Sequence, residues 1–95
     1  MFLHVTEAIY LYDHVIEVVF NDGRKGCADL SGAMKGPVFE PLRDAENFSK
    51  FRVDKELETI VWENGADLAP EFIYFQTFKA DPALEPQFRA WGYLP

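Results

Sequence analysis

The chain has 95 residues, of which 48% are apolar and 16% aromatic, with one cysteine and a formal net charge of −7. A chain of this length supports one domain and one core, burying about 60–65% of the surface that the unfolded chain exposes. The lone Cys27 excludes an internal disulfide and fits a reducing compartment. The chain has neither a basic, apolar leader nor an apolar run of about 20 residues, so we expect a cytoplasmic protein without a signal peptide or membrane span.

The distribution of charge argues against nucleic acid as a direct partner. The first basic residue is Arg24, so the predicted strands that precede it carry only acidic charges. A second acidic stretch extends from Asp54 to Glu71, and Lys55 is its only cation. Because nucleic-acid affinity comes largely from Lys and Arg, we expect no direct binding of DNA or RNA. Such a surface can steer a basic protein partner, or it can simply keep a small domain soluble.

The N-terminal segment predicts an antiparallel meander of three strands. The first strand ends in the β-rich run at residues 9–12, and Asp13 and His14 form the turn that follows. The second, residues 14–20, alternates between one face with Ile16, Val18 and Phe20 and another with Val15, Glu17 and Val19. Asn21-Asp22-Gly23 is a strong hairpin signal, and residues 24–30 follow as a weaker third strand.

The middle of the chain predicts short helices and a second hairpin. Residues 37–42 are typical of a helical or 3₁₀ turn that begins at a proline. Asp44 can cap a short helix that begins at Ala45 and directs Phe48 inward. Residues 51–53 become extended again and can pair with residues 59–62 across a polar loop.

Residues 59–74 predict a strand, a tight turn and a helix. Asn64-Gly65 suits positive φ and ends the strand, and Pro70 suits a first helical turn, capped by Asp67 or by the backbone at Ala69. Asn64, Asp67 and Glu71 could instead form a polar site at a helix N-terminus, where anions bind. The carboxylates of Asp67 and Glu71 would repel an anion, so we interpret Asn64, Asp67 and Glu71 as turn and cap residues.

The C-terminal residues predict an aromatic tail. We assign residues 1–75 to a single α+β domain and residues 76–95 to this tail. Asp81 or Glu85 can cap a short helix there, with Leu84, Phe88 and Trp91 along one apolar stripe. The stripe either covers an open face of the same domain or docks on a partner or a second copy, which would make a homodimer.

From Val5 to Tyr74 the chain resembles the bacterial family known as domain of unknown function 2442. The resemblance rests on ordered motifs: VVFNDG at 18–23, DL at 29–30, VFEPLRD at 38–44, FRVD at 51–54 and IVWENGADLAPE at 60–71. It implies a small α+β domain without an established activity or recognised catalytic residues. Some members carry a helix-turn-helix domain afterwards, and many lie beside small genes of toxin–antitoxin type. We take as family signature residues Asp22, Gly23, Asp29, Trp62, Asn64, Gly65, Asp67, Pro70 and Glu71.

Three departures from the family pattern stand out. Glu63 replaces a usual proline, and Glu58 replaces the glycine that usually closes the hairpin loop, which leaves the turn type of that loop open. The tail is too short for a helix-turn-helix domain, so the DNA-binding role of some relatives is not carried over.

No motif predicts catalysis or metal binding. Cys27 lies on a predicted strand without a neighbouring base to activate its thiol. We interpret His4 and His14 as surface residues at a turn or strand end. The carboxylates of Asp54, Glu56 and Glu58 lack the glycine and ligand spacing of a calcium loop, so a solvated loop is the stronger interpretation.

We therefore predict a non-catalytic protein-interaction module without a cofactor. Its candidate surfaces are the acidic sheet, with Glu7 and Glu17, and the tail, with Leu84, Phe88 and Trp91. The partner could be a small neighbouring gene product in an antitoxin-like pair. The alternative is a small enzyme or metal-binding protein that uses His14, Cys27 and nearby carboxylates.

Overall fold

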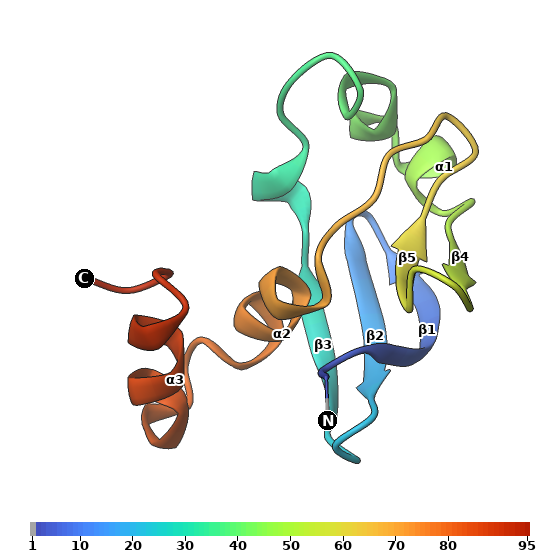
Figure 1. Ribbon diagram of the computed structural model, residues 1–95. Coiled ribbons are helices and arrows are strands. Elements are labelled where there is room, and N and C mark those ends of the chain that lie inside the picture. The colour runs from blue at the N-terminus through green and yellow to red at the C-terminus, as the bar shows by residue number, and fades with distance from the viewer. Residues whose placement is uncertain (1) are drawn as a thin grey trace.

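A computed structural model describes residues 2–95 and confirms the predicted α+β architecture. Strands β1 (Val5–Tyr12), β2 (Val15–Phe20) and β3 (Lys25–Asp29) form an antiparallel sheet in the order β1-β2-β3 (Figure 1). The predicted alternation on β2 is confirmed, because Ile16, Val18 and Phe20 are buried while the residues between them are half-buried. One face of this sheet therefore meets the core, and the other is open.

Short elements connect the sheet to a second hairpin. They are the 3₁₀ turns η1 (Ser31–Ala33) and η2 (Glu40–Arg43) and helix α1 (Ala45–Phe48), which Asp44 caps by accepting the N–H of Glu46 at 2.8 Å. Strands β4 (Arg52–Asp54) and β5 (Thr59–Val61) then pair antiparallel. Glu58, which closes their loop, has a φ of 58°. The position thus takes the left-handed conformation that glycine adopts without a steric penalty.

Helix α2 (Pro70–Phe78) packs on the core side of β3, and in Figure 1 it crosses in front of that strand. Pro70 occupies the first turn as predicted, and Ala69 is the N-cap residue without a side-chain cap. Asp67 is therefore not the cap; it forms a β-bridge with Val61. Close approach of helix and strand depends on Gly26, where an added Cβ would lie 2.7 Å from Cγ2 of Thr77.

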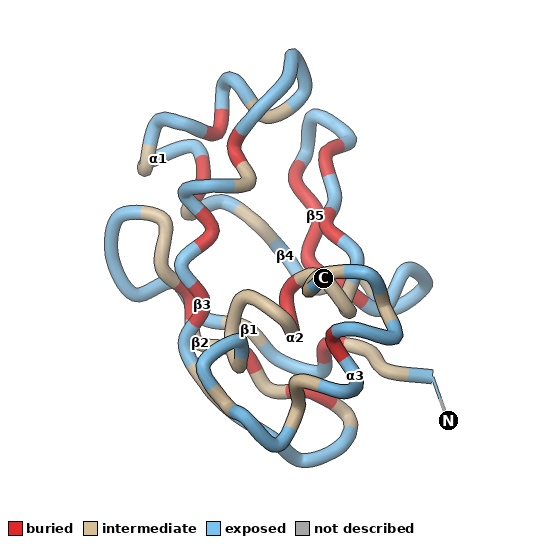
Figure 2. Tube along the Cα trace, turned by 90° about the vertical axis from the view of Figure 1, so that its left-hand side faces the viewer, coloured by how far each residue is buried: buried red, intermediate tan, exposed pale blue. Residues whose placement is uncertain are grey.

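The C-terminal tail folds back on the same domain. It contains the 3₁₀ turn η3 (Pro82–Leu84) and helix α3 (Glu85–Ala90). Asp81 caps η3 by accepting the N–H of Ala83 at 3.0 Å. Phe88 is fully buried in the common core, as the red segment of α3 in Figure 2 illustrates. The predicted boundary at residue 75 falls inside α2, so the tail and the domain share one continuous element.

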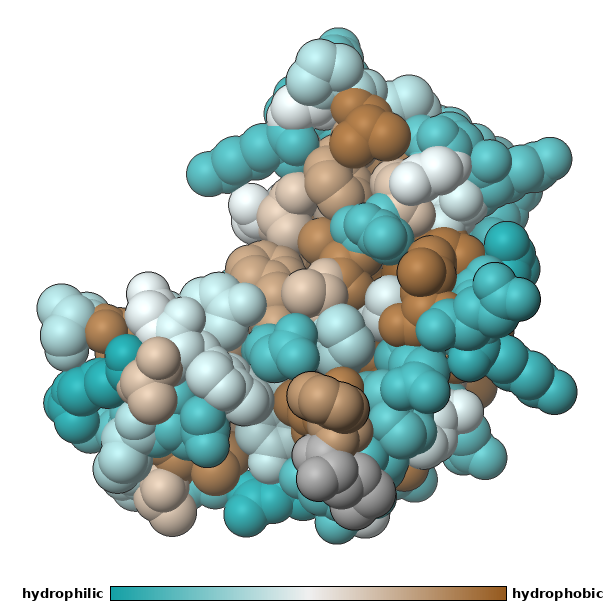
Figure 3. All heavy atoms as spheres, viewed as in Figure 1, coloured by the Kyte–Doolittle hydropathy of each residue, from teal (hydrophilic) through white to brown (hydrophobic). Residues whose placement is uncertain are grey.

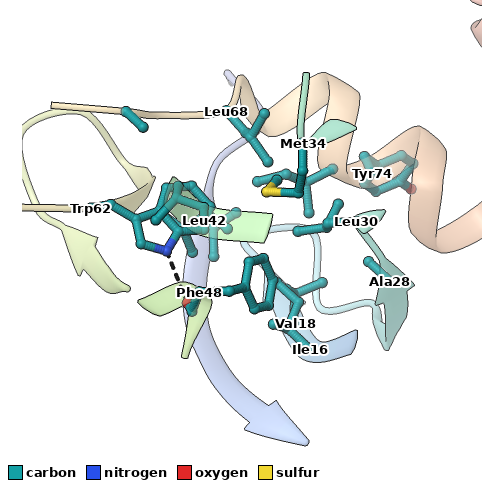
Figure 4. Close-up of a cluster of buried hydrophobic side chains, with 14 of the residues drawn as sticks. Ile16, Val18, Ala28, Leu30, Met34, Leu42, Phe48, Trp62, Leu68 and Tyr74 are labelled. Carbon is teal, nitrogen blue, oxygen red and sulfur yellow. Dashed lines mark hydrogen bonds between the residues drawn. The ribbon is translucent and has the colours of Figure 1, made fainter. Parts of the chain in front are cut away.

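The core lies between the sheet and the layer of helices and hairpin. In Figure 4, Phe48 lies against Val18 and Ile16 of β2, and Trp62 lies on the other side of Phe48. Met34 and Leu30 continue the cluster toward α2. The indole Nε1–H of Trp62 donates to the carbonyl oxygen of Phe48 at 2.9 Å, which satisfies both buried groups. Within the described residues, no helix combines the length and apolar character that a membrane crossing needs.

Candidate functional site

The open face of the three-stranded sheet gathers several side chains that the core does not use. The register places Ile9 of β1 and Cys27 of β3 on either side of Glu17, and Glu7 and Lys25 on either side of Val19. Two of the predicted interaction residues, Glu7 and Glu17, thus share one face. Glu17 is half-buried and its Oε1 lies 3.4 Å from Nζ of Lys25, whereas Glu7 is exposed.

The C-terminal half of β1 exposes four consecutive large side chains, which we call the β1 apolar patch: Ile9, Tyr10, Leu11 and Tyr12, exposed by 56%, 36%, 38% and 60%. These residues lie on an edge strand of the sheet. Elsewhere in residues 2–95, the exposed large apolar side chains are Phe2, Val38 and Leu57, each from a separate segment. Successive side chains of a strand point to opposite faces, so the patch wraps around the strand edge. Ile9 lies opposite Glu17 on the open face, whereas Tyr10 lies opposite Ile16 with its ring centroid 6.2 Å from that of Phe48. Exposed apolar side chains gathered at one sheet edge are typical of an interaction site, whereas scattered single residues are not.

The face seen in Figure 3 shows a different mixture. Hydrophobic atoms reach the surface in the middle of the view, and hydrophilic atoms surround them along most of the rim. Apolar surface is thus not confined to the sheet. β1 differs from the other segments because its exposed apolar residues are adjacent in one strand.

Carboxylates border the β1 apolar patch. Glu7 precedes it and Asp13 follows it, both exposed, and neither forms an ion pair within residues 2–95. Asp13 has a φ of 47°, which suits the tight turn between β1 and β2. The patch therefore combines an apolar centre with uncompensated negative charge at its two ends.

In the predicted tail surface, Phe88 is unavailable to a partner, whereas Leu84 and Trp91 are half-buried. Phe88 is fully buried, with ring centroids 5.0 Å from Phe75 and 6.3 Å from Tyr74, so it cannot contact a partner. Leu84 and Trp91 are half-buried and pack against the same core. The apolar stripe covers its own domain because α2 presents an aromatic face next to it.

A polar network connects the β2–β3 turn, α2 and the tail. The hydroxyl of Tyr74 donates to Oδ2 of Asp22 at 2.8 Å, Nε of Arg24 lies 3.8 Å from the same oxygen, and Nη1 of Arg24 lies 3.6 Å from Asp81. Burial, followed by the hydrogen bond to Asp22, raises the pKa of Tyr74 to about 12. Sequence reasoning assigned Asp22 to a turn and missed this contact, because it joins residues far apart in the chain.

The network predicts loss of stability at high pH. Because the folded-state pKa of Tyr74 lies above its unfolded value, its contribution is complete below pH 10 and is lost as pH rises toward about 12. We expect the melting temperature to fall in this interval, and to fall less in Tyr74→Phe. Thermal melts with phenolate absorbance at each pH test this, and an equal decline in both proteins would contradict it.

Most of the other signature residues lie in turns or at helix ends, whereas Trp62 lies in the core and Asp67 forms a β-bridge. Asp29 accepts the N–H of Ser31 at 3.0 Å, and this bond lowers the pKa of its carboxyl. Asn64 accepts the N–H of Ala66 and donates to the carbonyl of Val38, while Gly23 and Gly65 have φ values of 88° and 90°. Glu71 lies in the first turn of α2, where a negative charge is favourable.

The residues of the enzyme or metal-binding alternative occupy separate environments. Nε2 of His14 lies 2.7 Å from the carbonyl oxygen of Leu42, and its ring packs 4.8 Å from that of Phe48. Cys27 is exposed on the open sheet face. Within residues 2–95, no three His, Cys, Asp or Glu side chains are arranged to hold a metal ion. This arrangement supplies no positive support for that alternative.

One depression on the surface carries basic side chains. It has a volume of about 490 Å³ and is lined by Ser31, Lys35, Glu40 and Arg43, among others. The two cations come from the connection between β3 and α1, where sequence reasoning found no site. A carboxylate lies beside them, so the depression is of mixed charge.

The fold and the open sheet face define a small α+β domain with a one-sided antiparallel sheet. Residues 5–79 match the family described as "Protein of unknown function (DUF2442)", and the chain belongs to this family. The match ends just after α2, so it excludes η3 and α3.

Comparison with solved structures adds one relative of the fold. The chain is similar to a protein from Nitrosomonas europaea described as a "Putative DNA Binding Protein", with a TM-score of 0.71 and 16% identity. The similarity covers 83% of this chain and 51% of that one, so this chain spans about half the length of its neighbour. The search of curated proteins found no significant match.

Proposed function

We propose that this protein is a non-catalytic interaction module that binds a protein partner through the open sheet face and the β1 apolar patch. The observation that carries this proposal is the run of four adjacent side chains, each at least 36% exposed, on one edge strand. Aromatic residues such as Tyr10 and Tyr12 supply large contact area at interface centres.

Charge favours a basic partner. Glu7 and Asp13 border the patch and form no ion pair among residues 2–95, and the hairpin that contains them carries neither Lys nor Arg. Opposite charge on a partner would speed association and orient the complex. A small basic product of a neighbouring gene, in an antitoxin-like or accessory pairing, is the kind of partner that this surface fits.

Direct DNA binding is the second candidate, and the description of the structural neighbour is its motivation. In this chain the supporting feature is the depression with Lys35 and Arg43. Phosphate contacts need several cations on one surface, and Glu40 beside these two opposes them. We therefore favour protein over nucleic acid as the partner.

Co-expression with the product of the adjacent gene, followed by size-exclusion chromatography, tests the proposal. We expect co-elution, and we expect Ile9→Ser combined with Tyr12→Ser to abolish it. Leu57→Ser is the matched control, because Leu57 and Ile9 are both 56% exposed but Leu57 lies in the loop between β4 and β5. Separate elution at micromolar concentrations, or equal loss in the control, would contradict the proposal.

A further inference from the structure

We propose that the free edge of β1 at residues 8–12 accepts an added strand from a partner protein, an extended apolar segment flanked by Lys or Arg. This inference rests on the proposed function and specifies how the partner binds. Adding a strand satisfies the main-chain groups of a sheet edge, and alternate side chains supply specificity.

The hydrogen bonds of β2 show which backbone groups of β1 are free. The N–H of Phe20 donates to the carbonyl of Arg24 at 2.9 Å, and the carbonyl of His14 accepts from Leu30 at 2.8 Å, so these residues direct their backbone toward β3. Alternate residues of an antiparallel strand bond to opposite neighbours, so Glu17 and Val19 bond toward β1.

The register then identifies the outward groups on β1. Ile9 lies opposite Glu17 and Glu7 lies opposite Val19, so these two residues of β1 bond to β2. Ala8 and Tyr10 consequently direct their N–H and C=O groups away from the sheet. No other hydrogen bond within residues 2–95 uses these groups.

The hairpin of β4 and β5 covers the start of this edge, and on the core side the ring of Tyr10 packs 6.2 Å from that of Phe48. The hairpin of β4 and β5 approaches β1 where the N–H of Val5 donates to the carbonyl of Glu58 at 2.9 Å. Beyond that point β1 lies at the edge of its sheet, and β4 and β5 form a sheet of their own. In Figure 1 this hairpin lies next to β1. Natural edges are usually blunted by charge, proline or cover. Residues 8–12 contain neither a charge nor a proline, and their register irregularity lies at the far end, between Tyr10 and Tyr12.

Charge distinguishes the occupant from a second copy of this chain. Another copy would bring the same carboxylates, a net charge of −7 and a hairpin whose first basic residue, Arg24, lies beyond β2. A strand with cations at both ends would instead meet Glu7 at one end of the edge and Asp13 at the other. Electrostatic complementarity therefore selects a basic-flanked segment of a different protein.

Fluorescence anisotropy with synthetic peptides tests the inference on the full chain. The probe is a capped peptide of alternating valine and threonine between lysines, and its matched control carries glutamates instead. We expect the lysine-flanked peptide to bind about tenfold more tightly than the glutamate-flanked one. Lysines at the two ends are attracted to Glu7 and Asp13, whereas glutamates there are repelled. A third peptide, N-methylated on alternate amides along one edge, should lose most of its affinity because it cannot donate to β1.

Variants of the chain locate the binding. Glu7→Gln should reduce the preference for lysine flanks, whereas Glu63→Gln, an exposed carboxylate in the turn after β5, should leave it unchanged. Equal affinity of the lysine and glutamate peptides, or no saturable binding of either, would overturn the inference. Full affinity of the N-methylated peptide would refute strand addition while leaving an interaction face intact. Light scattering that shows a dimer lost in Ile9→Lys would assign the edge to a second copy and overturn the partner proposed here.

Discussion

Replacement of Phe88 by alanine lowers the free energy of unfolding by about 3–5 kcal/mol, the usual effect of removing a fully buried phenylalanine. Phe88 is 0% exposed and lies among the rings of Tyr74, Phe75 and Trp91. Since small domains are stable by about 5–15 kcal/mol, this loss is a large fraction of the total. Urea unfolding followed by circular dichroism measures it.

The matched control for this change is Phe2→Ala. Phe2 is 90% exposed, so the same chemical change should alter the free energy of unfolding by less than about 0.5 kcal/mol. Equal effects at the two positions would show that the tail is not part of the core. A chain that ends at Lys79, the last residue matched to the family, should also melt at lower temperature while remaining a monomer by light scattering.

The second large effect is expected at Trp62. Trp62→Ala should cost about 3–5 kcal/mol, because Trp62 is 3% exposed and contacts the rings of Phe39, Phe48 and Phe51. It also leaves the carbonyl of Phe48 without its donor. Chemical unfolding of the wild-type chain and of Trp62→Ala at the same pH measures this loss of unfolding free energy. The comparison requires that the free energy fall with denaturant at the same slope in both proteins.

Phenylalanine substitutions separate packing from the hydrogen bond. Trp62→Phe keeps an aromatic ring but removes the Nε1–H, and we expect a loss of about 1–3 kcal/mol. Trp91→Phe is the control, because Trp91 is half-buried and no hydrogen bond of its indole is seen within residues 2–95. A smaller effect at Trp62 than at Trp91 would contradict the role assigned to the buried hydrogen bond.

Local chemistry was sufficient to predict most elements. The Asn-Asp-Gly turn, the alternation on β2, the cap at Asp44 and the proline at the start of α2 all lie where expected. Each depends on neighbours in the chain, whose steric and hydrogen-bond preferences operate before any tertiary contact forms. The Asp67 alternative for the cap of α2 was wrong because that segment is held in a β-bridge to Val61.

The sequence predicted only part of the candidate site. Glu7 and Glu17 were expected on an acidic sheet and lie together on its open face. The run at residues 9–12 was recognised as β-rich, but its side chains were not expected to be exposed. The predicted three-stranded meander already placed this strand at an edge of the sheet. A strand of this composition is typical of a buried position, so the exposure of its side chains could not be predicted from the sequence.

The sequence by itself determined a single small α+β domain, the succession of its strands and turns, its acidic character and its family. The tertiary structure decided that the apolar stripe of the tail covers its own domain, that Asp22 meets Tyr74, and that β1 keeps a free apolar edge. The physical reason is that periodicity identifies which side chains need cover, whereas what covers them depends on contacts between distant segments.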